Sequence, residues 1–146
     1  MTVLFDSNVL IAYFDKSHQH NEPSRAVIAA LDYGDILVSA HSMSEVFNKL
    51  TRGGTTNPLA PDVIALVVGD FAARVIVRAL TADQTLLAIT EFARLGGRGP
   101  RVYDYLIGKV AVHHDASTIV TWNVRDMAPL FPTLTVITPA DFTGVA

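Results

Sequence analysis

The chain has 146 residues, half of them hydrophobic, which is typical of one ordinary globular domain. Its 11 basic and 14 acidic residues give a net charge of -3, which indicates neither a basic nucleic-acid-binding tail nor a highly charged disordered chain. The absence of cysteine excludes disulfides and zinc sites built from thiolates. No secretion signal precedes the first predicted strand, and no apolar run approaches the roughly 20 residues of a membrane span. We therefore expect a single domain over residues 1–146 that is cytoplasmic and makes no membrane contact.

Short runs rich in β-branched residues alternate with longer stretches of helical character. This alternation predicts an α/β fold, in which a central parallel sheet of about five short strands is flanked by helices. The predicted strands are residues 2–5, 36–39, 75–79, 118–121 and 134–137. The predicted helices are residues 23–33, 42–51, 61–73, 83–95 and 102–114.

Acidic and polar residues follow two of the predicted strands. Asp6 ends the first strand, and Asn123 and Asp126 come shortly after the fourth. In an open parallel sheet, ligands bind in the crevice beyond the carboxyl ends of the strands, so these side chains should meet there. Glu45, on the helix after the second strand, and Asp104, near the start of the helix before the fourth, are placed to reach the same rim.

Carboxylates that converge on one crevice repel one another unless a divalent cation neutralises them. Because all the ligands are oxygen atoms, the sequence favours a hard ion, Mg²⁺ or Mn²⁺. Each residue alone also has a purely structural interpretation: Asp6, Asn123 and Asp126 as turn or cap residues, Glu45 as a surface charge, and Asp104 as a partner of the helix dipole. The combination is what predicts an active site. We expect Asp6 and Asp104 on its rim rather than in the core.

Four short segments, in chain order, match motifs of a known family. The first, LFDSNVLI, carries Asp6 at the end of the first strand, and the second, SMSEV, carries Glu45 after a small hydroxyl residue. The third, YDYLI, carries Asp104 near the start of the last predicted helix, and the last, TWNVRD, begins with Thr121 at the end of the fourth predicted strand. With these motifs the chain resembles the PIN-domain nucleases over nearly its whole length, and in length and layout it resembles the VapC toxins of bacterial toxin–antitoxin pairs.

The resemblance implies a PIN-like fold and an Mg²⁺-dependent endoribonuclease, which cleaves RNA through attack of an activated water on the phosphodiester. It implies that Asp6 and Asp104 bind the metal and that Glu45 positions the water. Many members carry a fourth acid where this chain has Asn123, so either Asn123 or Asp126 completes the site. Thr121 is expected to orient a neighbouring carboxylate. The implied partners are an RNA substrate and a VapB-type antitoxin.

Several basic residues lie near the predicted site and are candidates for contacts with RNA phosphates. A solvated surface position is an equally good interpretation for each of them. Trp122 either stacks on a base or packs against a helix. We expect no metal role for the histidines, since neighbouring histidines on a helix point in different directions. The basic candidates are Lys49, Arg52, Arg98, Arg101, Lys109 and Arg125.

Two other functions stay open from the sequence. A phosphohydrolase with an aspartyl nucleophile also ends its first strand in Asp, but its motif needs a second Asp two positions later, where this chain has Asn8. A catalytically silent PIN-like module that binds RNA or protein would have lost its acids, whereas this chain keeps Asp6, Glu45 and Asp104.

The chain is apolar for its size, with a mean hydropathy of +0.34 and 17% charged residues. This composition predicts that another subunit covers part of the hydrophobic surface. We expect a homodimer, with partner contacts on the predicted helices at residues 61–73 and 83–95.

Overall fold

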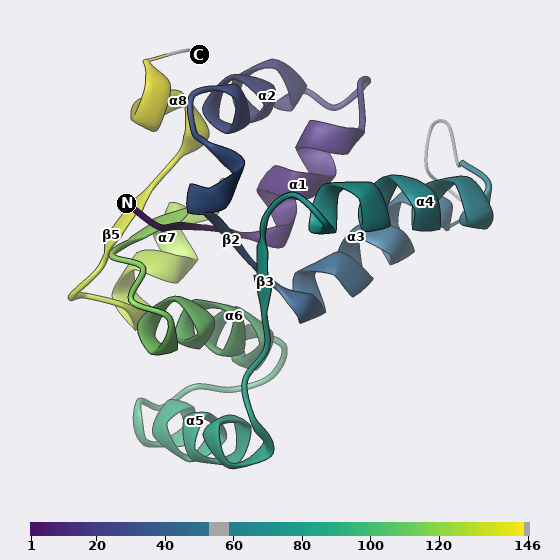
Figure 1. Cartoon of the computed structure of the whole chain (residues 1–146). Coiled ribbons are helices and arrows are strands. Elements are labelled where there is room, and N and C mark those ends of the chain that lie inside the picture. The colour runs from purple at the N-terminus through teal and green to yellow at the C-terminus, as the bar shows by residue number, and fades with distance from the viewer. Residues whose placement is uncertain (53–58, 145–146) are drawn as a thin grey trace.

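Five short strands form one sheet, all parallel, in the order β3-β2-β1-β4-β5 (Figure 1). The computed structural model describes residues 1–52 and 59–144. The predicted α/β fold with a central parallel sheet is confirmed, and no predicted strand is wrong by more than one residue at either end. The strands are β1 (Val3–Phe5), β2 (Ile36–Ser39), β3 (Ile76–Arg78), β4 (Thr118–Val120) and β5 (Thr135–Ile137).

The helices include three that the sequence analysis missed, namely α1, α7 and α8. α1 follows β1 at once, because the Asp6 side chain accepts a hydrogen bond from the Ser7 backbone N–H and caps the helix. Since α1 has only eight residues and most of them are apolar, it shows no clear helical periodicity. The prediction for residues 23–33 began too late and ended too late: α2 ends at Ala29, and Tyr33–Asp35 form a separate 3-10 turn. The helices are α1 (Ser7–Phe14), α2 (Asn21–Ala29), α3 (Ala40–Thr51), α4 (Pro61–Ala72), α5 (Ala82–Arg94), α6 (Arg101–His113), α7 (Val124–Met127) and α8 (Pro139–Thr143).

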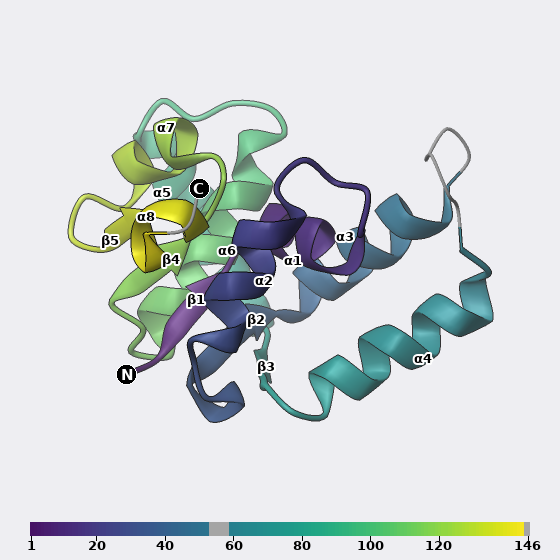
Figure 2. The same ribbon diagram turned by 90° about the horizontal axis from the view of Figure 1, so that it is seen from above.

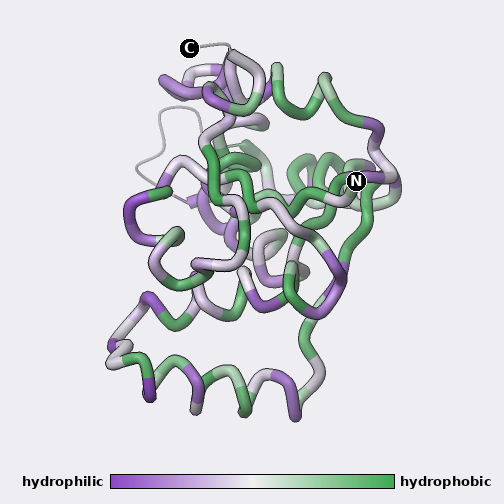
Figure 3. The backbone as a smooth tube through the Cα atoms, turned by 90° about the vertical axis from the view of Figure 1, so that its left-hand side faces the viewer, coloured by the Kyte–Doolittle hydropathy of each residue, from purple (hydrophilic) through white to green (hydrophobic). Residues whose placement is uncertain are grey.

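Helices cover both faces of the sheet, so the three inner strands, β1, β2 and β4, are buried on both sides, whereas the edge strands β3 and β5 are partly exposed (Figure 2). Side chains alternate along β1: Val3 and Phe5 pack in the core beneath α1, α2, α3 and α4, whereas Leu4 packs in the core beneath α5 and α6. The strands accordingly form the hydrophobic centre of the chain (Figure 3). This double burial explains the continuous apolar runs by which the sequence revealed the strands.

α3 and α4 lie side by side and extend away from the sheet (Figures 1 and 2). α4 exposes Val63, Leu66 and Val67, and α5 exposes Leu86 and Ile89. Among residues 1–52 and 59–144, no helix has the length and apolar character to cross a membrane.

Gly108 in α6 gives a test of the packing between α6 and the segment after α7. A Cβ atom at this position would overlap the ring of Phe131, which is itself buried. We therefore expect Gly108→Ala to lower the free energy of unfolding by about 1–3 kcal/mol, since overpacking outweighs the better helix propensity of alanine. Chemical denaturation monitored by circular dichroism measures this change.

Gly69 in α4 is the matched control, because a Cβ atom there meets open space. Gly69→Ala should leave stability unchanged or raise it by about 0.5–1 kcal/mol. Equal effects of the two substitutions would contradict the close approach of Gly108 to Phe131.

Candidate active site

Asp6 lies at the carboxyl end of β1 with both carboxylate oxygens occupied by hydrogen bonds. Its Oδ1 accepts from the Ser7 backbone N–H at 2.8 Å, and its Oδ2 accepts from the Thr121 hydroxyl at 2.8 Å. The predicted role of Thr121 in orienting a carboxylate is thus confirmed. The expectation of a rim position for Asp6 was wrong: only 4% of the residue is exposed, because α1 begins directly over the strand end.

Glu45 reaches the same strand end from α3. The Ser7 hydroxyl donates to Glu45 Oε1 at 2.7 Å and lies 3.0 Å from the Ser42 hydroxyl. His41 Nε2 lies 3.5 Å from the same Glu45 oxygen, and the His41 ring stacks on Tyr103, next to Asp104. Ser7 therefore joins the residues around Asp6 to those on α3.

Asp104 stands half-buried in the first turn of α6. Burial raises its pKa, the charges of Glu45 and Asp126 raise it further, and the Arg101 guanidinium opposes them. Burial likewise raises the pKa of Asp6 to about 6; the Thr121 hydrogen bond opposes this shift, and the charges of Asp104 and Glu45 add to it. The three predicted acids therefore lie within electrostatic reach of one another.

Asn123, the N-cap of α7, and Asp126, within α7, follow β4 and contact each other. The Asn123 amide donates to Asp126 Oδ2 at 3.1 Å, and its backbone N–H donates to the Thr121 hydroxyl at 3.0 Å. Arg101 donates to the Asp126 backbone carbonyl at 2.7 Å. Of the two candidates for completing the site, only Asp126 adds negative charge near Asp104.

The donor set is suited to a hard divalent cation. Within the described part of the chain, no three His, Asp or Glu side chains are grouped closely enough to enclose a metal ion. Mg²⁺ commonly binds through one or two carboxylates and keeps several of its waters, so it does not need such a cage. Burial and the charges of neighbouring acids disfavour the ionised forms of Asp6 and Asp104. Two such carboxylates fit an ion of this kind.

Comparison with protein families identifies this arrangement. A family model described as PIN domain matches residues 3–125. The chain belongs to the PIN domain family. A search of curated proteins gave no match.

Solved structures share the PIN fold at low sequence identity. The Mycobacterium tuberculosis toxin VapC20, described as cleaving the sarcin-ricin loop, superposes with a TM-score of 0.71 at 15% identity, covering 88% of this chain and 95% of its own. FitAcB from Neisseria gonorrhoeae gives 0.67 at 20% identity, covering 94% of this chain and 98% of its own. VapBC2 from Rickettsia felis, bound to a promoter DNA fragment, gives 0.65 at 17% identity with coverage of 94% and 98%.

The basic residues of this PIN domain differ in how accessible they are. Arg52, Arg98, Arg101 and Arg125 are exposed. Lys109 instead pairs with Glu91 at 3.1 Å, with 16% of its side chain exposed, and its ammonium lies 5.9 Å from the centre of the Tyr105 ring. The ion pair between α5 and α6 disfavours a contact of Lys109 with RNA phosphates, and such a contact stays a prediction.

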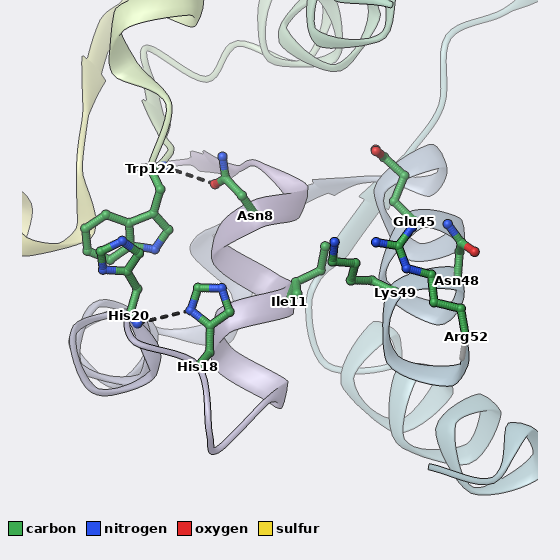
Figure 4. Close-up of a pocket in the computed structure, with 9 residues that line it drawn as sticks. All are labelled: Asn8, Ile11, His18, His20, Glu45, Asn48, Lys49, Arg52 and Trp122. Carbon is green, nitrogen blue, oxygen red and sulfur yellow. Dashed lines mark hydrogen bonds between the residues drawn. The ribbon is translucent and has the colours of Figure 1, made fainter. Parts of the chain in front are cut away.

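A pocket of about 500 Å³ adjoins the acidic cluster of the PIN domain (Figure 4). Glu45, Lys49 and Arg52 line it from α3, and His18, His20 and Trp122 line it from the opposite side. Trp122 is half-buried: it packs against the core, as one of its two interpretations predicts, and its indole N–H donates to Ser24 Oγ at 2.9 Å. It also lines the pocket, so the contact with a base stays a prediction. The sequence indicates only that His18 and His20 are poor metal ligands. No local pattern reveals that they lie beside Trp122.

The raised pKa of Asp6 predicts a pH-dependent stability for protein freed of divalent ions with EDTA. The folded protein binds the Asp6 proton up to about pH 6, whereas the unfolded chain releases it near 3.8. Stability contributed by the protonated carboxyl is therefore present at low pH and is lost as the pH rises through this window. The full change amounts to about 3 kcal/mol.

Asp6→Asn removes this titration and keeps the size of the side chain. Between about pH 4 and about pH 7.5, the stability of Asp6→Asn relative to wild type should therefore rise by about 2 kcal/mol, whatever the constant effect of the altered hydrogen bonds. Urea unfolding at a series of pH values measures the difference. A difference that does not vary with pH would mean that burial leaves Asp6 an ordinary carboxyl.

Proposed function

We propose that this PIN domain is an Mg²⁺-dependent endoribonuclease of the VapC toxin type. The observation that carries the proposal is the convergence of Asp6, Glu45 and Asp104, in which burial, together with the charges of the two neighbouring acids, raises the pKa of Asp6 to about 6. Such a cluster weakens the folded protein on its own, and a bound divalent cation would offset the repulsion. Its position beyond the carboxyl ends of β1 and β4 is where open α/β sheets bind ligands.

In this proposal Asp6 and Asp104 hold the ion, which when bound lowers the pKa of water and stabilises charge on the leaving oxygen. The hydrogen bonds from Ser7 and Thr121 fix both oxygens of Asp6, so the carboxylate is oriented before the substrate arrives. The Ser7 hydroxyl fixes Glu45, which orients the water for attack on the phosphate. Cleavage leaves a 5′-phosphate on the downstream fragment and a 3′-hydroxyl on the upstream fragment.

The structural neighbours support a toxin with a protein partner. VapC20 is described as a toxin that cleaves the sarcin-ricin loop, and VapBC2 as bound to a DNA fragment from its promoter. By analogy we assign this chain an RNA substrate and a VapB-type antitoxin, which silences it by inserting a basic side chain among the acids.

The role of Asn8 argues against the phosphohydrolase. That reaction needs a second Asp at this position, but here the Asn8 amide donates to the Thr121 hydroxyl and its carbonyl accepts from the Trp122 backbone N–H. Asn8 therefore links α1 to the residues that follow β4 through two hydrogen bonds. Phosphate release from a small ester, with no RNA fragments, would favour the phosphohydrolase.

Asp104→Asn tests the metal role without disturbing a buried residue. We expect RNA cleavage in Mg²⁺ to fall by about two orders of magnitude or more, because a metal ligand is lost. The melting temperature should stay unchanged or rise, since a repelling charge is removed. Asp32→Asn, an exposed aspartate outside the cluster, is the control and should retain full activity. Full activity of Asp104→Asn would remove this residue from the site.

The Mg²⁺ requirement of two variants shows whether Asp126 or Asn123 contributes more to metal binding. Asp126→Asn should raise several-fold the Mg²⁺ concentration needed for half-maximal cleavage, because Asp126 adds negative charge next to Asp104. Asn123→Ala should have a smaller effect, because its amide brings no charge and only donates to Asp126. Metal titrations of the two variants decide the order, and the reverse order would assign Asn123 to the metal.

We further propose that the protein is a homodimer held by apolar faces of α4 and α5. Leu66 and Leu86 are 75% and 65% exposed, unusually high for leucines within helices of a small domain. Light scattering at micromolar concentration should show a dimer, and Leu66→Lys or Leu86→Lys should shift it to monomer. Val112→Lys, on the exposed side of α6, should leave the mass unchanged. A wild-type monomer would contradict the proposal.

A further inference from the structure

The pocket next to the acidic cluster has two chemically different walls that face one another (Figure 4). α3 supplies Lys49 and Arg52 on one side, and His18 lies opposite with the His20–Trp122 pair. The volume, about 500 Å³, falls within the range of ordinary ligand sites, roughly 300–1,000 Å³. Glu45 and Asn8 belong both to this pocket and to the active-site cluster, so a ligand in the pocket would lie next to the reaction centre.

The aromatic wall is held rigidly. The rings of His20 and Trp122 are stacked, with centroids 3.9 Å apart and planes 13° apart. Trp122 is fixed further through its indole N–H, which donates to Ser24, and its backbone N–H, which donates to Asn8. A preformed flat aromatic surface of this kind suits a nucleobase, because stacking on it requires little further ordering of the side chains.

His18 adds a neutral hydrogen-bond donor to this wall. Its Nδ1 accepts a hydrogen bond from the His20 backbone N–H at 3.0 Å, so the neutral ring carries its proton on Nε2. Burial lowers the pKa of His18, and the nearby charges of His20 and Lys49 lower it further, against the opposing effect of Asp15. A neutral donor suits the polar edge of a base better than it suits a phosphate.

The opposite wall supplies positive charge. Lys49 lies in the last turn of α3, and the exposed Arg52 is its C-cap. A free phosphate would use this wall alone and a flat uncharged ligand the other wall alone, whereas a nucleotide uses both. Because duplex RNA keeps its bases stacked and paired, only an unpaired nucleotide can present its base to such a pocket.

We propose that this pocket binds one unpaired nucleotide of the substrate RNA, with its base against His18 and the His20–Trp122 stack and its phosphate towards Lys49 and Arg52. The pocket thereby selects the cleavage position from the identity of a base next to the scissile phosphate. This inference rests on the proposed ribonuclease function. It names recognition residues that lie outside the acidic cluster.

Trp122 is the only tryptophan of the chain and reports directly on the pocket. In EDTA, which prevents cleavage, the full-length protein is titrated with the four homotetranucleotides of RNA and with inorganic phosphate. At least one tetranucleotide should quench Trp122 emission with saturation, and phosphate should not. Absence of quenching by every tetranucleotide, or equal quenching by phosphate, would overturn the proposal.

Two pocket variants and two controls refine this titration. His18→Ala and Arg52→Ala should each weaken binding about tenfold, His18→Ala for the preferred base and Arg52→Ala for all four. Arg52 is exposed at the end of α3, so its replacement does not threaten folding. His113→Ala and Arg94→Ala, exposed positions on α6 and α5, should bind as wild type. Unchanged binding by both pocket variants would contradict the assignment.

Cleavage of a randomised RNA separates this inference from the proposed function. With Mg²⁺, sequencing of the 5′ ends of the fragments should show a base preference at a position flanking the cut, and His18→Ala should flatten it. A preference that survives in His18→Ala would overturn base selection by the pocket while leaving the ribonuclease intact. If wild type cleaves no RNA, the ribonuclease proposal fails, and the Trp122 titration still decides whether the pocket binds nucleotides.

Discussion

The rest of the site depends on the hydrogen bonds that the Thr121 hydroxyl makes. It is completely buried at the end of β4, where it donates to Asp6 and accepts from the Asn123 backbone and the Asn8 amide. These contacts join the carboxyl ends of the central strand β1 and its neighbour β4 to the first turn of α1. A buried polar group is stable only when its hydrogen bonds are made, so these four residues hold one another in a single arrangement.

This arrangement holds a carboxylate in an environment that disfavours its charge. Two hydrogen bonds favour the ionised form of Asp6, but burial and the charges of Asp104 and Glu45 outweigh them, and its pKa is raised. A residue serving only as the cap of α1 would be better placed in solvent. The cost of ionising the buried Asp6 carboxyl is therefore explained if the cluster serves to bind a cation and a substrate rather than to stabilise the fold.

Asn8 and Glu45 extend the same framework into the neighbouring pocket. Asn8 ties the backbone of Trp122 to α1, and Glu45 connects through Ser7 to Asp6. The aromatic wall that we assign to a base and the carboxylates that we assign to the metal are thus fixed by the same strand ends. A rigid connection of this kind would set the distance between the recognised base and the scissile bond, which a site-selective nuclease requires.

The sequence by itself determined the α/β fold, the parallel strands and the meeting of Asp6, Glu45 and Asp104. Buried strands appear as continuous apolar runs, and parallel strands bring their carboxyl ends to one edge wherever these occur along the chain. Only the tertiary structure decided that Lys109 pairs with Glu91, that Asp126 accepts from Asn123, and that His20 stacks on Trp122, about a hundred positions away. It also decided that residues 7–14 form α1, since packing over the strand end stabilises an apolar helix whose sequence shows no periodicity. The physical reason is that periodicity reports which face of an element is buried, whereas side-chain partners depend on how distant elements pack.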